Sequence, residues 1–220
     1  MISILKRVLP VKFKTFLKKF RKFNSINNLD KKLLKYLNFK DGFYIECGAN
    51  DGVNQSNTWY FEKNLNWRGI LIEPNKQIFE ELKKNRSSKN IFKNVALVSE
   101  DFKNKNEEIY LTKNNLESKL TNVCTFPNQK VVTETLNNIL KEINVNKINF
   151  FSLDVEGYEE EVLRGLNLNS FDIDYILIET NNLDKINSTL KSCNYILQEN
   201  LSFRDYLFKK LKHDSNNDFS

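Results

Sequence analysis

The stretch FYIECGANDG, at residues 43–52, combines side chains and spacing that could bind a ligand. A strand-like apolar run ends at Glu46, and a short turn containing Gly48 and Gly52 follows it. Glycine turns of this kind can bind the pyrophosphate of a dinucleotide, because bare backbone approaches the phosphates at the start of a helix. The other residues of the turn decide whether a phosphate-bearing ligand would fit here.

The charge of this turn disfavours a dinucleotide. The dinucleotide pattern Gly-x-Gly-x-x-Gly needs glycine at the positions where Asn50 and Val53 stand. Glu46 and Asp51 would also bring two negative charges to the phosphates. Each such charge pair costs about 1–4 kcal/mol at effective dielectric constants of about 20–80. We therefore expect that the chain is not an NAD-dependent dehydrogenase.

S-adenosylmethionine suits these charges, because it carries an ammonium and a sulfonium and no phosphate. Glu46 could bind its amino group directly or through water. Glu73 lies 21 residues beyond Gly52 at the end of the next predicted strand, the position of a ribose-binding acid in dinucleotide folds. Glu100 or Asp101, after the third predicted strand, could accept a hydrogen bond from the adenine amine. The alternative for this last pair is a solvated acidic turn.

Predicted strands and helices alternate along the chain, and the central strands are almost entirely apolar. This pattern is typical of a doubly wound, mostly parallel α/β sheet, whose ligands bind beyond the carboxyl ends of the strands. Glu46, Glu73, Asp154 and Glu179 each end a predicted strand, although strand ends are also polar simply because loops are polar. Strands are predicted at 43–47, 69–73, 91–97, 109–111, 148–154, 175–180, 195–197 and 204–210, and helices at 30–39, 55–64, 74–84, 133–141, 159–164 and 184–192.

Four blocks of the sequence resemble the FkbM family of S-adenosylmethionine-dependent methyltransferases. They are ECGANDGVNQSNTWYFEKNLNWRGILIEPN at 46–75, NVALVSE at 94–100, FFSLDVEGYEEEVLRG at 150–165 and ILIET at 176–180. The stretches SNTWYFE and DVEGYE are far more specific than the glycine turn. The resemblance covers about residues 40–210. It implies the seven-stranded, Rossmann-like class I methyltransferase fold and, in most cases, O-methylation of a hydroxyl on a sugar or secondary metabolite.

The resemblance also implies a set of cofactor-binding positions. Cys47 replaces a residue that is often Val in the family, which should be harmless, and Glu100 stands where Asp is common, which puts the adenine contact in doubt. The implied positions are Glu46, Gly48, Asn50, Asp51, Gly52 and Ser56 on the methionine and turn side, Glu73 at the ribose, and Ala96, Ser99 and Glu100 in the region that frames the adenine.

Asp154 and Glu156 are the candidate catalytic residues. Methyl transfer is an in-line displacement that the protein mainly aligns, but an alcohol acceptor must also lose its proton. A positioned carboxylate that takes this proton contributes about 10²–10⁴-fold. If the strand continues, both side chains lie on one side, so one could be the base and the other could orient it or bind sugar hydroxyls. Alternatively, DVEGYE simply begins a helix, where acids are favoured. The only histidine, His213, lies in the tail, and no metal-ligand spacing supports a metal between Asp154 and Glu179.

The net charge of +6 comes from the start of the chain. Residues 1–22 contain eight Lys or Arg and no acid, which leaves about −2 for the rest (6 − 8). We predict a basic amphipathic arm at 1–28, a methyltransferase domain at 29–211 and a flexible tail at 212–220. Residues 1–23 have helical apolar spacing that is interrupted at Pro10, so they could pack on the domain or a partner, lie on an anionic membrane surface, or bind nucleic acid.

Composition and cysteine usage bear on the cellular compartment and on the partners of the chain. The three cysteines are far apart in sequence, which argues against a disulfide framework or a zinc site and favours the reducing cytoplasm, with peripheral membrane contact through the arm as an option. The nearly neutral body argues against nucleic acid as a partner. We expect a small-molecule or glycan acceptor. The rival functions are a non-catalytic cofactor-binding or membrane-associated scaffold and a nucleic-acid methyltransferase.

Overall fold

The computed structural model of the chain describes residues 22–104, 109–111, 120–121 and 129–211. Residues 1–21 of the predicted arm and the whole of the predicted tail at 212–220 lie outside the described residues, as do Cys124 and His213. None of the helices in these described ranges is long and apolar enough to cross a bilayer.

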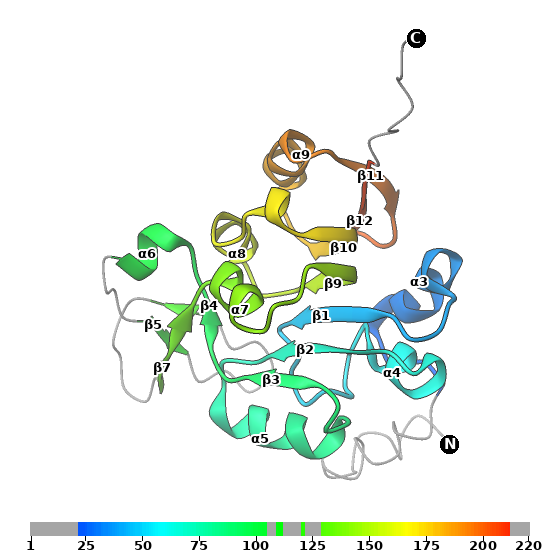
Figure 1. The fold of residues 1–220 in the computed structure, drawn as a ribbon, viewed down its shortest axis with the longest axis horizontal. Coiled ribbons are helices and arrows are strands. Elements are labelled where there is room, and N and C mark those ends of the chain that lie inside the picture. The colour runs from blue at the N-terminus through cyan, green and yellow to red at the C-terminus, as the bar shows by residue number, and fades with distance from the viewer. Residues whose placement is uncertain (1–21, 105–108, 112–119, 122–128, 212–220) are drawn as a thin grey trace, which may run out of the picture.

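A seven-stranded sheet forms the centre of the molecule (Figure 1), with the strand order β11-β12-β10-β9-β1-β2-β3. Strands β3, β2, β1, β9 and β10 run parallel to one another, whereas β12 is antiparallel to both β10 and β11. The predicted doubly wound, mostly parallel sheet is therefore confirmed. The strands are β1 (Phe43–Cys47), β2 (Arg68–Ile72), β3 (Ile91–Lys93), β9 (Lys147–Leu153), β10 (Asp172–Glu179), β11 (Tyr195–Asn200) and β12 (Asp205–Lys210).

Helices cover both faces of this sheet. Alternate side chains of each strand point to opposite faces, so each face has its own apolar cluster for helices to cover. In β1, Ile45 and Cys47 belong to one apolar cluster, whereas Tyr44 belongs to the other. The first cluster includes buried side chains of α7 (Leu136–Glu142), α8 (Glu159–Arg164) and α9 (Leu183–Ser192). The second includes buried side chains of α3 (Leu29–Leu37), α4 (Trp59–Leu65) and α5 (Lys76–Asn85).

The strand predicted at 91–97 is two strands. The central sheet keeps only β3, and β4 (Ala96–Leu97) pairs with β8 (Thr133–Glu134) in a separate two-stranded sheet. Asn94 lies at the division, where its side-chain amide donates hydrogen bonds to the carbonyls of Glu73 and Pro74, at 2.8 and 3.0 Å. These bonds hold the chain at the end of β2, so the apolar run cannot continue as one strand.

Two predicted helices begin later than their apolar spacing suggests. The helix predicted at 55–64 begins at Trp59, because Gln55 has a positive φ of 64° and the Ser56 hydroxyl accepts hydrogen bonds from the amides of Thr58 and Trp59. The helix predicted at 133–141 begins at Leu136, after Thr135 caps it. Polar side chains that bond the local backbone fix both starts.

A small three-stranded sheet lies beside the central one and contains β5 (Ile109–Leu111), β6 (Leu120–Thr121) and β7 (Gln129–Val131), in the order β6-β5-β7. Figure 1 shows β5 and β7 near α6 (Glu100–Asn104) and β4. The sequence predicted only β5. Two short 3₁₀ helices, η1 (Ile26–Asn28) and η2 (Leu168–Ser170), complete the described elements.

The described end of the predicted arm packs on the domain. The ring of Phe23 stacks on Tyr60 with 4.8 Å between ring centroids. The buried Asp30 carboxylate accepts hydrogen bonds from the Asn24 amide and the Ser25 hydroxyl, both at 2.7 Å. Residues 23–30 are therefore part of the packed body.

Candidate functional site

The glycine turn lies at the edge of the sheet where β1, β2, β9 and β10 end, which we call the carboxyl edge. Gly48 has a φ of +76°, and a Cβ atom there would lie 1.8 Å from the carbonyl oxygen of Asp154. The amides of Gly48 and Ala49 donate to the carbonyl of Ile72, at 3.1 and 3.0 Å. The turn is thus packed between the ends of β2 and β9, and Gly48 leaves no room for a side chain.

Side chains within the turn hold its shape. Asp51 accepts hydrogen bonds from the amides of Val53 and Asn54, at 2.9 and 2.7 Å. A Cβ atom on Gly52, whose φ is also +76°, would lie 2.6 Å from the Leu82 side chain. Asn50 also has a positive φ, of 49°, and its amide points to Glu73. The residues predicted on the turn side of the cofactor are therefore held in one defined loop.

Glu73 joins the turn to the end of β2. Its carboxylate accepts hydrogen bonds from the amides of Asn50 and Asn75, at 3.0 and 2.8 Å. The residue is 7% exposed, and among the described residues no Lys or Arg forms an ion pair with it. Burial raises the pKa of Glu73 to about 7, against the opposing effect of the two backbone hydrogen bonds. Such a carboxylate suits a ligand whose uncharged groups donate hydrogen bonds to it.

Glu46, predicted to bind the amino group of the cofactor directly or through water, lies in a buried network of hydrogen bonds. It is 3% exposed, and its oxygens accept hydrogen bonds from the Ser56 hydroxyl at 3.0 Å, the Asn57 amide at 2.7 Å and the Thr58 hydroxyl at 2.6 Å. Arg86 forms an ion pair with it at 3.3 Å. A direct contact with a ligand ammonium would have to displace one of these donors. Glu46 and Ser56 therefore lie in a buried network that supports the turn.

Arg86 is the centre of this network, and the sequence analysis missed it. Its side chain is fully buried and contacts Glu46, Glu62 at 2.8 Å and the carbonyl of Gly52 at 3.1 Å. It also donates to the hydroxyls of Tyr44 and Thr58, at 2.7 and 2.8 Å. One guanidinium therefore links β1, the start of α4, the glycine turn and the end of α5. No local sequence signal marks it, since it follows a lysine-rich helix and resembles a solvated residue.

The charges of the network stabilise one another. Burial alone would raise the pKa of Glu62, but the charge of Arg86 and the hydrogen bonds from Arg86 and Asn90 outweigh it and lower the pKa to about 2. Burial alone would lower the pKa of Arg86, but Tyr44 and the two glutamates hold it above its usual value. Burial also raises the pKa of Tyr44, which stays a neutral hydrogen-bonding group.

Asp154 and Glu179 form a carboxyl pair at the ends of β9 and β10. Leu153 pairs with Ile178 in the sheet, so the next residue of each strand lies beside the other. Burial raises the pKa of Asp154 well above its usual value, and the charge of Glu179 and a hydrogen bond with it raise the pKa further. Glu179 also forms an ion pair with Arg204 at 2.7 Å.

Strand β9 does not continue to Glu156, so strand alternation does not set the side on which Glu156 lies. Strand β9 ends at Leu153, and Glu156 has a left-handed φ of 53° in an exposed turn before α8. The buried Glu159 closes this turn, because its carboxylate accepts hydrogen bonds from the amides of Val155 and Gly157. Of the two predicted catalytic acids, Asp154 lies against Gly48 of the glycine turn, and the charge of Glu156 is near enough to help raise the pKa of Asp154.

The residues predicted to frame the adenine lie along β4 and the start of α6. Ala96 is 1% and Ser99 4% exposed, and the Ser99 hydroxyl accepts a hydrogen bond from the Phe102 amide. Glu100 accepts a hydrogen bond from the Thr135 hydroxyl at 3.1 Å. Both acceptors serve the local fold, so their proposed contact with adenine stays a prediction.

A match to a protein-family model identifies the family of this chain. Residues 46–197, more than half of the chain, match the model of the Methyltransferase FkbM domain. The chain belongs to the FkbM methyltransferase family. The matched residues include the glycine turn, Arg86 with Glu46 and Glu62, Glu73 and the Asp154–Glu179 pair.

Two solved methyltransferase structures align with this FkbM domain. A methyltransferase FkbM from Methylobacillus flagellatus KT aligns over 80% of this chain and 45% of its own, with a TM-score of 0.51 and 16% identity. A methyltransferase from Geobacter sulfurreducens aligns over 96% of this chain and 94% of its own, with a TM-score of 0.49 and 11% identity. The chain thus spans less than half the length of the M. flagellatus protein. The first likeness confirms the class I methyltransferase fold.

One curated protein also matches, the eukaryotic translation initiation factor 2-alpha kinase PK4 of Plasmodium falciparum. It is 28% identical over 200 residues, which are 88% of this chain but 6% of the kinase. The FkbM domain has neither the His-Arg-Asp nor the Asp-Phe-Gly motif that kinase catalysis uses. The match therefore gives no support for a kinase function of this chain.

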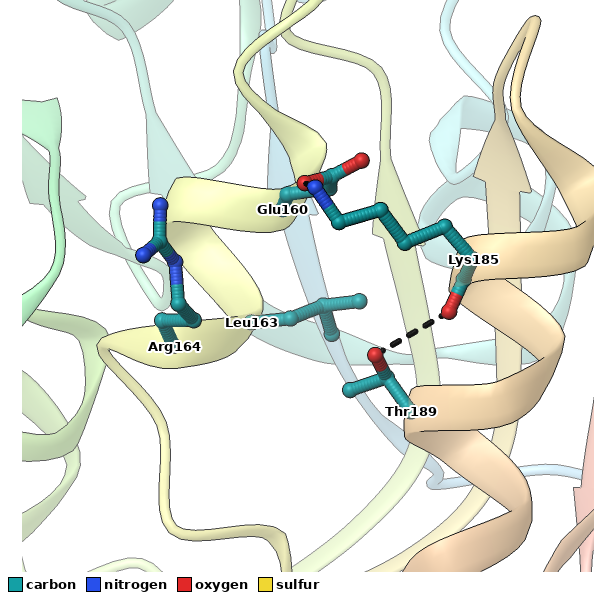
Figure 2. A pocket seen from close by; sticks show the side chains of 5 residues that line it. All are labelled: Glu160, Leu163, Arg164, Lys185 and Thr189. Atoms are coloured by element: carbon teal, nitrogen blue, oxygen red, sulfur yellow. Dashed lines mark hydrogen bonds and ion pairs between the residues drawn. The ribbon is translucent and has the colours of Figure 1, made fainter.

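A small pocket lies elsewhere in the FkbM domain, between α8 and α9 (Figure 2). Its volume is about 110 Å³, and Glu160, Leu163, Arg164, Lys185 and Thr189 line it. Lys185 forms an ion pair with Glu160, and the Thr189 hydroxyl donates to the Lys185 carbonyl at 3.1 Å. The pocket is smaller than typical ligand sites of about 300–1,000 Å³. We therefore place the candidate site at the carboxyl edge. In the described part of the chain, no group of three or more His, Cys, Asp or Glu residues could hold a metal ion.

Proposed function

We propose that the chain is an S-adenosylmethionine-dependent methyltransferase that methylates a hydroxyl group of a sugar, glycan or related metabolite. Family membership supports methyl transfer. One observation carries the choice of cofactor, namely the buried, cation-free carboxylate of Glu73, which holds the glycine turn at the end of β2. It can accept hydrogen bonds from ribose hydroxyls and would repel a phosphate at the same place.

The residues around the turn fit this cofactor. Asn57, at the start of α4, donates its side-chain amide to Ser152 at 3.0 Å, but its buried Oδ1 atom has no hydrogen-bond partner among the described residues. An unpaired buried acceptor beside the turn suits a ligand that carries an ammonium group. Asn57 and Glu73 would therefore bind the two ends of the cofactor, while Glu46 and Arg86 hold the turn between them.

Bound S-adenosylmethionine would supply an electrophilic methyl group on its sulfonium. The chain's own residues would place the acceptor hydroxyl at the carboxyl ends of β9 and β10 and take its proton. The Asp154–Glu179 pair is placed to take that proton, and burial together with the charge of Glu179 raises the pKa of Asp154 well above its usual value. The two hydrogen-bonded carboxyl groups would receive the proton as a pair.

Calorimetric titration of the full chain with S-adenosylhomocysteine, and separately with NAD, tests the cofactor. We expect binding of the first ligand alone and at least about tenfold weaker binding by Glu73→Gln, since two charge-assisted hydrogen bonds would be lost. Glu81→Gln is the matched control, because the Glu81 carboxylate on α5 is half-exposed and forms a surface ion pair with Lys84. Its affinity should equal that of the wild type.

Three results would overturn this proposal. They are a folded protein that binds no S-adenosylhomocysteine, binding of NAD with similar affinity, and an unchanged affinity in Glu73→Gln. Circular dichroism of each variant confirms that it is folded before titration.

A further inference from the structure

The hairpin between β11 and β12 extends past the carboxyl edge. Glu179, the last residue of β10, pairs with Asp205, the first residue of β12. Residues 201–204 therefore lie beyond the end of β10, on the same edge as the glycine turn. Phe203 is 90% exposed, the largest value for an exposed large apolar side chain among the described residues. The exposed phenyl ring offers an apolar face at this edge on which a ligand ring could stack.

The backbone of this hairpin tip is held in place. The Leu201 amide donates to the Asp205 carbonyl at 2.8 Å, and the Thr180 amide donates to the Arg204 carbonyl at 2.9 Å. The Tyr206 hydroxyl donates to the Phe203 carbonyl at 3.3 Å. Leu201 itself is 5% exposed and anchors the tip in the core. The tip thus presents the Phe203 ring from a fixed backbone, which limits the entropy lost on binding.

Arg204 connects this tip to the carboxyl pair. Its Nη2 atom lies 2.7 Å from Glu179, which is hydrogen-bonded to Asp154. The Asp154 carbonyl in turn contacts Gly48. A continuous row therefore runs from the glycine turn through Asp154, Glu179 and Arg204 to Phe203. Half of the Arg204 side chain (48%) remains exposed, so further donors of its guanidinium face solvent.

The position of the row decides which substrate it faces. Under the proposed function, Glu73 on β2 would bind the ribose, on one side of β1 in the sheet order, whereas β9, β10 and β12 lie on the other side. The transferred methyl group and the acceptor therefore belong over β9 and β10. We propose that Phe203 and Arg204 form the acceptor subsite, where the apolar face of a sugar ring stacks on Phe203 and Arg204 donates hydrogen bonds to its hydroxyls.

The charges of the row favour an uncharged sugar. The row contains the two carboxyl groups of Asp154 and Glu179 and the one guanidinium of Arg204, so it has no excess of positive charge. Glu156 adds a carboxylate on the neighbouring turn, whereas Glu160 and Glu161 of α8 form ion pairs with Lys185 and Arg164. A phosphorylated sugar or a nucleotide sugar would be repelled there. The subsite therefore suits a neutral hexose or deoxyhexose.

Transfer of labelled methyl groups from S-adenosylmethionine to a defined panel tests this subsite, which rests on the proposed function. The panel consists of methyl glycosides of glucose, mannose, galactose, rhamnose and fucose, with glucuronic acid and glucose 1-phosphate as charged comparisons. We expect transfer to a neutral glycoside, a KM about tenfold higher for that sugar in Phe203→Ala, and a similar rise in Arg204→Ala. Arg204→Lys should recover part of the affinity.

Two controls keep the outcomes distinct. Ile196→Ala removes an apolar side chain that is 42% exposed from β11 of the same hairpin, far from the tip, and should leave KM within about twofold. Binding of S-adenosylhomocysteine should be unchanged in all four variants. Absence of that binding in the wild type would overturn the proposed function itself. Normal binding without transfer to any neutral glycoside, or an unchanged KM in Phe203→Ala, would overturn the acceptor subsite alone.

Discussion

At the scale of single residues, alanine substitutions at Gly48 and Gly157 distinguish the cost of backbone strain from the cost of a steric clash. Both have positive φ, +76° and +100°, but a Cβ atom on Gly48 would lie 1.8 Å from the Asp154 carbonyl oxygen, whereas one on Gly157 would meet nothing within 4 Å. We expect Gly157→Ala to cost about 1–3 kcal/mol of unfolding free energy from strain alone. Gly48→Ala should cost at least about 2 kcal/mol more, because the ends of β1 and β9 must also separate. Urea denaturation measures both, and equal losses would contradict the packing described here.

Glu73 is the residue whose protonation should report ligand binding. Its pKa is raised from 4.5 to about 7 by burial, so near pH 6 most molecules hold a proton there. Hydroxyl donors of a bound ribose would favour the charged carboxylate and expel this proton. We expect S-adenosylhomocysteine to bind about tenfold more weakly at pH 6 than at pH 8. Titrations in buffers of different ionisation enthalpy would show the proton release, and Glu73→Gln should remove this pH dependence. Equal affinity of the wild type at both pH values would contradict this linkage.

The same raised pKa has a consequence for stability without ligand. An acid whose folded-state pKa lies above its unfolded value contributes stability below pH 4.5 that is lost as the pH rises towards 7. Glu73→Gln should therefore unfold at a higher temperature than the wild type at pH 8, with a smaller difference at pH 5. Differential scanning calorimetry at the two pH values measures this, and the reverse order would contradict a raised pKa.

At the scale of elements, Arg86 determines how α4, α5 and the turn after β1 hold together. Removing it takes the buried cation away from Glu46 and leaves Glu62 with the ion pair to Lys63, so Arg86→Met should cost about 3–5 kcal/mol of unfolding free energy. Glu62→Gln in the same chain should recover part of this loss. Lys84→Met, two residues earlier, removes an exposed ion pair with Glu81 and should cost less than about 1 kcal/mol. Urea denaturation compares the three, and similar costs for Arg86→Met and Lys84→Met would show that the network contributes little.

How far the sequence predicts these elements depends on where their stabilising contacts lie. The strands β1, β2, β9 and β10 are predictable, because a run of apolar residues that ends in an acid is a local signal. The partners of Glu46 are not, since Arg86 lies 40 residues away and its own neighbours resemble a solvated helix end. The division between β3 and β4 also escapes a local analysis, because it depends on Asn94 reaching back to Glu73. Thus the acids of the site were predictable, whereas the roles of those that are buried with distant partners were not.

At the scale of the whole molecule, the ligand should protect only one end of the sheet. The candidate cofactor residues in the loops after β1 and β2 and the candidate acceptor residues at the ends of β9 and β10 all lie at the carboxyl edge. The loops at the opposite edge, at 38–42 and 144–146, precede β1 and β9 and contribute no candidate residue. Hydrogen exchange measured by mass spectrometry, with and without saturating S-adenosylhomocysteine, can compare the two edges in one experiment.

We expect exchange to slow several-fold in residues 48–58 and 73–76, because binding stabilises the closed loops by mass action. Residues 38–42 and 144–146 should exchange at unchanged rates. Since the hairpin tip at 201–204 would face the acceptor, it should change little with the cofactor product alone and should be protected further when a neutral methyl glycoside that serves as acceptor is added. Protection at the opposite edge would place the ligand elsewhere. Protection of the tip by S-adenosylhomocysteine alone would contradict this arrangement. It would place S-adenosylhomocysteine on the other side of β1, over the strands that we assign to the acceptor.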